Sequence, residues 1–224
     1  MGKLKALDEN FNLTNKRIIL RIDLNVPIQA GKVTDESRIK KVIPIIKELT
    51  NRKAKIILIS HLGRPKGKID EKLSLRPVTP ILKNLLNSEV YFSEENYGPN
   101  VIDKSKKIKS GEVLLLENIR FNKEEETNDE AFAKELSKVG DIYVNEAFSC
   151  SHRAHASVCE ITRHIDSYAG KLLTDEVKAI NMLKNKAEKP VSCIIGGSKI
   201  STKIGILTNL AKQMQTIVIV GNQK

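Results

Sequence analysis

The chain reads RIILRIDLNVP from residue 17 to residue 27, and this stretch decides the fold. Its first seven residues form a largely continuous apolar, β-branched run, as expected for a strand that is covered on both faces of a parallel sheet. Runs of the same character occur at residues 55–60, 113–117, 141–145, 191–195 and 216–220. The sequence therefore predicts a series of buried parallel strands.

Helical patterns lie between these runs, over residues 34–50, 74–86, 128–139 and 173–186. Thr34 or Asp35 and Asn128 are the predicted N-caps, Pro44 should kink the first helix, and Gly140 should end the third. Such alternation predicts an α/β fold in which a Rossmann-like parallel sheet lies between two helical layers. We expect a first domain at 1–170, a linking helix at 171–189 and an incomplete second α/β domain at 190–224, because two strands and a helix cannot bury a core.

The composition is that of an ordinary globular chain, with 40% hydrophobic and 29% charged residues in 224. No apolar run reaches the ~18 residues of a membrane-spanning helix and no secretory signal is visible, so we expect no membrane partner and a cytoplasmic location. Three cysteines fit free thiols in a reducing compartment. The net charge of +11 fits nucleic acid, small phosphates or a lysine-rich surface. Four tyrosines, no tryptophan and no aromatic–basic ladder argue against nucleic acid.

Polar residues gather just after the carboxyl ends of four predicted strands. They are Asp23 and Asn25, then His61 and Arg64, then Arg120, and finally His152 and Arg153. Ligands of open parallel sheets bind outside the carboxyl ends of the strands, so we expect these side chains at one rim. Arginine forks match phosphate and carboxylate oxygens. The pattern predicts a site for a small anion, with Asp23 and Asn25 selecting a hydroxyl group on it.

Each of these residues also has a structural explanation. Asp23 alone fits a turn cap, His61 alone fits a structural hydrogen-bonding residue, and Arg120 alone fits a surface ion pair. Their joint occurrence at strand ends favours a binding site.

A zinc site is the alternative for Cys150 and Cys159, which flank two histidines at positions 152 and 155. Their spacing matches no finger or ribbon pattern, and Arg153 between them would repel a cation. We therefore expect no metal at this segment.

A last motif, GGSKISTK, occupies residues 196–203 after a predicted strand. Gly196 and Gly197 before a helix start would bring backbone amides against a phosphate. Lys199 and Lys203 are four residues apart, so both can face the same phosphate chain. The motif is not a Walker A loop, and tight backbone packing is the alternative explanation.

Together these segments resemble phosphoglycerate kinases. The resemblance rests on RIDLNVP at 21–27, SHLGRP at 60–65, LLENIRF at 115–121, HRAHAS at 152–157 and GGSKISTK at 196–203, in the family's order and at its approximate spacings. It covers nearly the whole chain, and the first two motifs are very specific.

The resemblance implies a role for each matching position. Asp23 and Asn25 match the residues that hold the hydroxyl-bearing part of 3-phosphoglycerate, and Arg38 matches the arginine beside its carboxylate and the moving phosphoryl group. The patch that grips the 3-phosphate is matched by His61, Arg64, Arg120 and Arg153.

On the nucleotide side, the resemblance assigns Gly196, Gly197, Lys199 and Lys203. Lys199 matches the lysine that follows the transferred phosphoryl group, and Lys203 matches one on the α-phosphate. Arg38 and Lys199 are therefore the expected catalytic residues.

The implied reaction is the reversible glycolytic transfer between 1,3-bisphosphoglycerate and ADP, which gives 3-phosphoglycerate and ATP with Mg2+ as cofactor. The carboxylate acceptor is already ionised, so we expect positioning and positive charge to act rather than a general base. Hinge closure about the linking helix would bring Arg38 and Lys199 together.

Three departures from the family pattern stand out. Glu146 replaces the usual Asp, Ser149 replaces a common Gly, and the sequence stops at Lys224, before the expected magnesium ligand and adenine pocket. We therefore expect a truncated monomer that binds 3-phosphoglycerate, binds ADP or ATP weakly and lacks full activity. The alternative is a non-catalytic phosphoglycerate-binding module that needs a second polypeptide.

Overall fold

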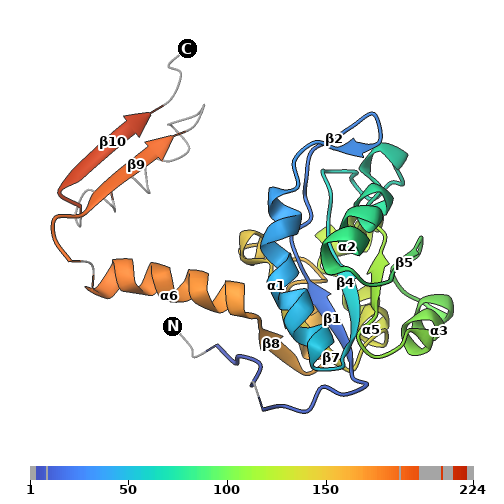
Figure 1. Ribbon diagram of the computed structural model, residues 1–224. Helices are drawn as coiled ribbons and strands as arrows, with labels where there is room; N and C mark the ends of the chain where they lie inside the picture. Colours follow the sequence, from blue (N-terminus) through green and yellow to red (C-terminus); the bar gives the residue numbers. More distant parts are fainter. Residues whose placement is uncertain (1–3, 9, 187, 197–207, 209–213, 221–224) are drawn as a thin grey trace. The chain divides into compact units, whose positions relative to one another are not determined.

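The computed structural model describes residues 4–8, 10–186, 188–196, 208 and 214–220 (Figure 1). The chain divides into two compact units, Met1–Glu176 and Val177–Lys224, and each is described by itself. Among the described residues, no helix combines the length and the apolar character needed to cross a membrane.

The first unit is built on a parallel sheet with the strand order β5-β6-β4-β1-β7-β8. The strands are β1 (Arg17–Arg21), β4 (Lys55–Ile59), β5 (Val90–Ser93), β6 (Val113–Leu116), β7 (Ile142–Asn145) and β8 (Ser167–Ala169). A short antiparallel hairpin, β2 (Ile28–Gln29) and β3 (Lys32–Val33), follows β1. The predicted α/β class with a parallel sheet is confirmed, and the quoted stretch at residues 17–27 supplies a central strand.

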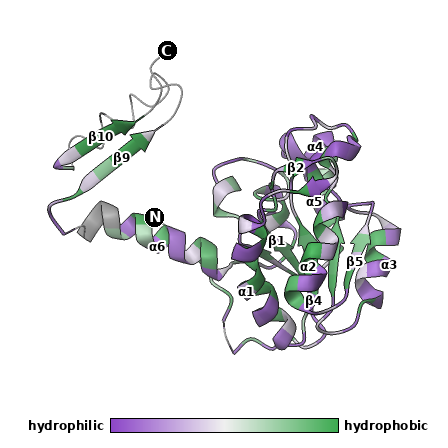
Figure 2. Ribbon diagram, turned by 45° about the horizontal axis from the view of Figure 1, so that its top comes forward, coloured by the Kyte–Doolittle hydropathy of each residue, from purple (hydrophilic) through white to green (hydrophobic). Residues whose placement is uncertain are grey.

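The central strands are apolar on both sides because each face of the sheet packs on its own helical layer. In β1, Ile18 and Leu20 join one core while Ile19 joins the other. Helices α1 (Ser37–Asn51) and α2 (Thr79–Leu86) cover the first face, whereas α3 (Pro99–Lys107) and α5 (Glu130–Ser137) cover the second. The strands are correspondingly hydrophobic in Figure 2, while the helices carry both hydrophobic and hydrophilic residues. A three-layer arrangement follows.

Helix boundaries differ from the predicted ones in ways that hydrogen bonding explains. Helix α1 begins after Glu36, whose side chain makes no capping hydrogen bond. The predicted cap Asp35 lies one residue earlier, and its carboxylate accepts from the hydroxyl and the N–H of Ser37. The cap of α5 is Asp129, which accepts from the backbone N–H of Phe132, rather than Asn128. The predicted caps were therefore wrong by one or two positions.

One proline and one glycine were singled out in the helices. Pro44 lies inside α1, which continues to Asn51, and the predicted kink stays a prediction. Helix α5 ends at Ser137, before Gly140. Gly140 is instead needed for packing, since an added Cβ would lie 2.5 Å from Cγ1 of Ile19 on β1.

The sequence analysis missed the edge strands β5 and β8 and the helix α3. The remaining short elements are the 3-10 turns Glu71–Leu73, Arg76–Val78, Ile119–Phe121, Phe148–Cys150 and Glu160–Arg163, and the one-turn helix α4 (Lys123–Glu126). Helix α6 (Lys171–Lys186) begins in the first unit and continues into the second. In the second unit, the predicted strands β9 (Ser192–Gly196) and β10 (Thr216–Val220) pair in parallel. The functional assignment of the two domains stays a prediction.

Candidate functional site

The loops that follow β1, β4, β6 and β7 carry the predicted anion-binding residues. Strand β1 lies between β4 and β7, and β6 is the next strand beyond β4, so these four carboxyl ends are neighbours at one edge of the sheet. The strand-end rule therefore places the loops side by side, as the sequence analysis expected. Their side-chain contacts define the site.

The loop after β4 is fixed from both sides by residues of other strand ends. The Asn25 side-chain oxygen accepts from the backbone N–H of Gly63 at 2.9 Å, and Arg120 Nη1 donates to the Gly63 carbonyl at 2.8 Å. Asn118 pairs with both backbone groups of Leu62, accepting at 3.1 Å and donating at 2.7 Å. Gly63 itself has φ +59°, a left-handed conformation that favours glycine. The loop that carries His61 and Arg64 is thus preorganised.

Arg120 is the most unusual of the predicted residues. It is only 2% exposed, and its Nε and Nη2 atoms are enclosed without a hydrogen-bond partner among the described residues. The Nε atom comes within 3.3 Å of Glu126 Oε1, but without hydrogen-bond geometry. Burial and then the nearby charge of Arg153 lower the pKa of Arg120. A buried cation whose donors lack partners is suited to bind an anion.

His61 and Arg153 lie close to Arg120. Burial, followed by the positive charges of Arg21, Arg120 and Arg153, lowers the pKa of His61 to about 2. The half-buried Arg153 donates from Nε to Nε2 of His152 at 3.3 Å. Arg64 is exposed and makes no hydrogen bond or ion pair with the described part of the chain. Of the predicted basic patch, His61 and Arg153 are therefore close to Arg120, whereas no contact connects Arg64 to them in the described structure.

Asp23 and Arg38 form a second part of the rim. Arg38 Nη1 pairs with Asp23 Oδ2, the same oxygen accepts from the Ser149 hydroxyl at 2.6 Å, and Asp23 Oδ1 accepts from the N–H of Asn25 at 3.0 Å. Asp23 and Arg38 line a hollow of about 280 Å³ together with Glu146 and Ser149. Both oxygens of Asp23 and the oxygen of Asn25 thus have partners within the protein.

The predicted nucleotide-binding residues fall mostly outside the described residues. Gly196 ends strand β9, whereas Gly197, Lys199 and Lys203 lie in a part of the chain that the structure does not describe. Among the residues described, no group of three or more His, Cys, Asp or Glu side chains is arranged to hold a metal ion.

Sequence analysis missed a buried group beneath the rim. Arg21 at the end of β1 is fully buried, and its guanidinium contacts His61 and Ser157. Ser157 in turn donates to the buried Glu125 carboxylate. The signal was present in the sequence, because an arginine inside an otherwise apolar strand must find polar partners.

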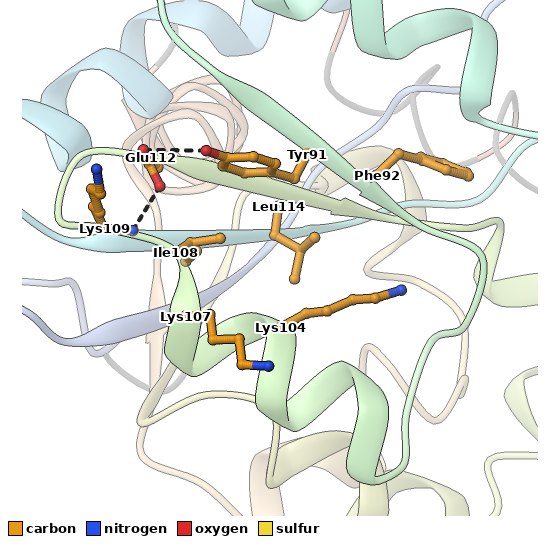
Figure 3. Close-up of a pocket in the computed structure, with 8 residues that line it drawn as sticks. All are labelled: Tyr91, Phe92, Lys104, Lys107, Ile108, Lys109, Glu112 and Leu114. Atoms are coloured by element: carbon orange, nitrogen blue, oxygen red, sulfur yellow. Dashed lines mark hydrogen bonds between the residues drawn. The ribbon is translucent and has the colours of Figure 1, made fainter.

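A hollow of about 340 Å³ lies elsewhere, between α3 and the amino ends of β5 and β6 (Figure 3). Its polar groups bond to their own neighbours: Lys104 donates to Ser93, and Glu112 accepts from the Tyr91 hydroxyl and the Lys109 N–H. None of the predicted site residues lines it. The rim at the carboxyl ends of the strands is therefore the candidate site.

Comparisons with known proteins identify relatives of this chain. A family model described as phosphoglycerate kinase matches residues 8–223. Phosphoglycerate kinases of Sinorhizobium medicae and Orientia tsutsugamushi are 43% and 49% identical over 217 and 207 residues, which are 97% and 92% of this chain but 54% and 51% of theirs.

Solved structures give the same result. Phosphoglycerate kinase from Coxiella burnetii has a TM-score of 0.84 at 36% identity, covering 98% of this chain and 55% of that one. The enzyme from Pyrococcus horikoshii has a TM-score of 0.86 at 31% identity, covering 95% of this chain and 54% of that one. The chain thus spans about half the length of the curated relatives that it matches.

Proposed function

Because the chain belongs to the phosphoglycerate kinase family, we propose that its first unit binds 3-phosphoglycerate, or 1,3-bisphosphoglycerate, at the carboxyl-end rim. The unit would thereby take part in the glycolytic transfer of a phosphoryl group between 1,3-bisphosphoglycerate and ADP. The reaction class is phosphoryl transfer to a carboxyl acceptor.

One observation carries this proposal. Arg120 is enclosed at the rim with two nitrogen atoms that lack hydrogen-bond partners among the described residues, and the charge of Arg153 lies near enough to lower its pKa. Such a group is stable only if the surrounding fold holds it in place, and a phosphate dianion would supply the missing acceptors. A buried arginine with a purely structural role is expected to have its donors satisfied within the protein.

The other rim residues take roles that fit their positions. His61, Arg64 and Arg153 join Arg120 at the 3-phosphate. Asp23 and Asn25 hold the hydroxyl-bearing part, which requires an incoming hydroxyl to share or displace the contacts they make in the free protein. Arg38 leaves or shares its ion pair with Asp23 to meet the substrate carboxylate and the moving phosphoryl group.

The chemistry needs positive charge more than a base. The acceptor carboxylate is ionised at neutral pH, so catalysis comes from alignment and from cations that stabilise the charge on the transferred group. Arg38 would supply this charge from the first unit, and Lys199, with Lys203, Gly196 and Gly197 on the nucleotide, from the second. Mg2+ with ADP or ATP is expected of the family, and the described residues offer no cluster of His, Cys, Asp or Glu side chains for it.

The second candidate is a non-catalytic role in binding. The chain would then be a phosphoglycerate-binding module that acts with a second polypeptide. The apolar strands β9 and β10 favour this possibility, because Ile194 and Ile219 are 72% and 51% exposed. For the first candidate we propose a monomer, and for both we propose a cytoplasmic protein that binds neither nucleic acid nor membrane.

Thermal unfolding with increasing 3-phosphoglycerate tests the binding proposal. We expect the melting temperature to rise with ligand concentration, since a ligand of the folded state alone stabilises it. Arg64→Met should reduce the rise without changing the ligand-free melting temperature, because Arg64 makes no bonds within the described residues. Arg163→Met is the matched control, since the Arg163 side chain is 72% exposed and pairs only with Glu160 at 3.3 Å in the described structure.

The two candidates differ in turnover. A coupled assay for ATP formation from 1,3-bisphosphoglycerate should show activity of the chain alone if it is a kinase, and none if it is a binding module. A melting temperature that 3-phosphoglycerate leaves unchanged would contradict both.

A further inference from the structure

Arg21 connects the buried interior to the candidate site. Its side chain is fully buried, and all three nitrogens have partners: Nε donates to Ser157 Oγ at 3.1 Å, Nη1 to the Ile22 carbonyl at 2.6 Å, and Nη2 lies 3.2 Å from Nδ1 of His61. This arginine therefore contacts His61 from the buried interior of the unit.

The contact determines which nitrogen of His61 carries the proton. A guanidinium has only N–H donors, so Nδ1 of His61 must face it with a lone pair. The imidazole is then neutral and its hydrogen lies on Nε2. A proton on Nδ1 would point at the N–H of Arg21 Nη2. The Cys150 sulfur, 3.7 Å from the same Nδ1, is too weak an acceptor to compensate for that repulsion.

Charges around the ring act in the same direction. Burial and the charges of Arg21, Arg120 and Arg153, with a smaller contribution from His155, all lower the pKa of His61. Nε2 makes no hydrogen bond with the described residues and is not among their enclosed polar atoms without a partner. It remains open to an incoming ligand.

Arg21 is itself held by a carboxylate through a hydroxyl. Ser157 accepts from Arg21 Nε and donates its own proton to Glu125 Oε1 at 2.7 Å, while its backbone N–H donates to Glu125 Oε2 at 2.8 Å. Glu125 is fully buried. Burial alone would raise the pKa of Glu125, but His155, Arg21 and Ser157 lower it overall, so the carboxylate is ionised and balances the charge of Arg21.

We propose that Glu125, Ser157 and Arg21 form a positioning relay that fixes His61 as a neutral imidazole with its proton on Nε2. His61 then gives the bound anion one directed hydrogen bond and no charge. This role for His61 in binding rests on the proposed function, whereas the tautomer does not. The benefit is electrostatic: Arg120 and Arg153 already repel each other here, and a cationic His61 would add to that repulsion before the anion arrives.

The tautomer can be measured directly. In protein labelled with 15N-histidine, a long-range proton–nitrogen spectrum should give His61 a pyridine-like Nδ1 and a pyrrole-like Nε2 signal, unchanged between about pH 8 and pH 5. The His61→Gln variant assigns the signals. An imidazolium pattern within this range, or a proton on Nδ1, would overturn the proposal.

Two matched variants test the relay. Ser157→Ala removes the hydroxyl that accepts from Arg21, and we expect His61 to show mixed tautomers or to titrate within the same pH range. Ser105→Ala is the control, because Ser105 is an equally buried serine whose Oγ accepts from Arg17 Nη1 at 3.3 Å on α3. It should lose similar stability and leave the His61 signals unchanged. Identical His61 spectra in both variants would refute the positioning role, and the wild-type spectrum remains decisive for the tautomer if Ser157→Ala fails to fold.

A ligand-binding experiment separates this inference from the proposed function. The ratio of 3-phosphoglycerate dissociation constants for wild type and His61→Gln should stay within about twofold between pH 8 and pH 6, because a neutral donor does not titrate there. Titration of the ligand phosphate cancels in the ratio. A tenfold change toward acid pH would mean that His61 binds as a cation. If 3-phosphoglycerate does not bind at all, the proposed function fails while the spectra still decide the tautomer.

Discussion

Arg120→Met should make the protein more stable while removing its ligand response. Methionine keeps most of the apolar stem of Arg120, so the change acts mainly on the guanidinium. The variant loses the bond from Nη1 to the Gly63 carbonyl, a contribution of about 1.5–3 kcal/mol for a charged donor. It also loses the pair with Glu126, whose carboxylate is 40% exposed, for about 0–1 kcal/mol.

Against this loss stand two enclosed donors without partners, Nε and Nη2. Each such group opposes folding by about 1–3 kcal/mol, and removing the charge also removes repulsion from Arg153. The balance favours the variant by about 1 kcal/mol, which corresponds to a rise in melting temperature of about 2–4 °C for a domain of this size.

Ligand binding should change in the opposite direction. Losing two charge-assisted hydrogen bonds should weaken the binding of 3-phosphoglycerate by at least about 3 kcal/mol, which is a more than 100-fold increase in its dissociation constant. 3-Phosphoglycerate at 100 times the wild-type dissociation constant stabilises wild type by about 2.7 kcal/mol, which raises its melting temperature by about 5–10 °C. The same concentration should raise the melting temperature of Arg120→Met by about 1 °C or less.

Differential scanning fluorimetry with and without ligand measures both effects, with Arg163→Met as the control that changes neither. Two outcomes would refute the idea that the unpaired donors of Arg120 destabilise the ligand-free protein and bind the ligand: a variant that melts more than about 5 °C below wild type, or one that keeps the full ligand response.

Three further changes should alter stability, measured by urea unfolding. Gly67→Ala should lower the free energy of unfolding by about 1–3 kcal/mol, because an added Cβ would lie 2.6 Å from Cβ of Lys123. Gly31→Ala is the control, since Gly31 has nearly the same φ but nothing within 4 Å of an added Cβ, and it should lose less. Equal losses would contradict this explanation. Asp141→Asn should reduce stability at neutral pH. Burial raises the pKa of Asp141 but hydrogen bonds from Arg17 lower it overall, so its contribution is present above the unfolded pKa of about 3.8 and is lost as pH falls through the lower folded value; a pH-independent difference would count against it. Glu146→Gln should instead raise stability at neutral pH, since burial raises the pKa of Glu146 and one of its oxygens is enclosed without a partner among the described residues. The gain should be full above the folded pKa and disappear below the unfolded pKa of about 4.5. A loss of stability at neutral pH would contradict the raised pKa.

The strands of the fold could be predicted wherever both faces of the sheet are covered. Strands β1, β4, β6 and β7 are continuous apolar runs because their residues alternate between two cores. The edge strand β5 was missed because Tyr91 is 43% exposed and only one side has a neighbouring strand, so its pattern is short and mixed. Helix α3 was missed because its sequence, PNVIDKSKK, is mostly polar and buries only Val101 and Ser105.

The site was predictable at the level of strand ends and not at the level of contacts. Parallel strands bring their carboxyl ends to one edge whatever the side chains do, so the proximity of His61 to Arg120 and Arg153 followed from topology alone. Whether an arginine at that edge is paired depends on packing between segments far apart in the chain. The bond from Ser149 to Asp23 spans 126 residues, and no local pattern indicates it.

These pairings divide the positive charge of the rim into two kinds. Arg38 is neutralised by Asp23, and Arg21 is neutralised by Glu125 through the Ser157 hydroxyl. Arg120 has only the half-exposed Glu126 carboxylate near Nε and no partner for Nη2 among the described residues, and the His61 that we propose to be neutral adds a donor without adding charge. We therefore expect a dianion to gain most near Arg120 and Arg153, and a hydroxyl to exchange hydrogen bonds beside Asp23 at little electrostatic penalty. Under the proposed function, this asymmetry would orient a three-carbon phosphate with its phosphate group at Arg120 and its carboxylate toward Arg38.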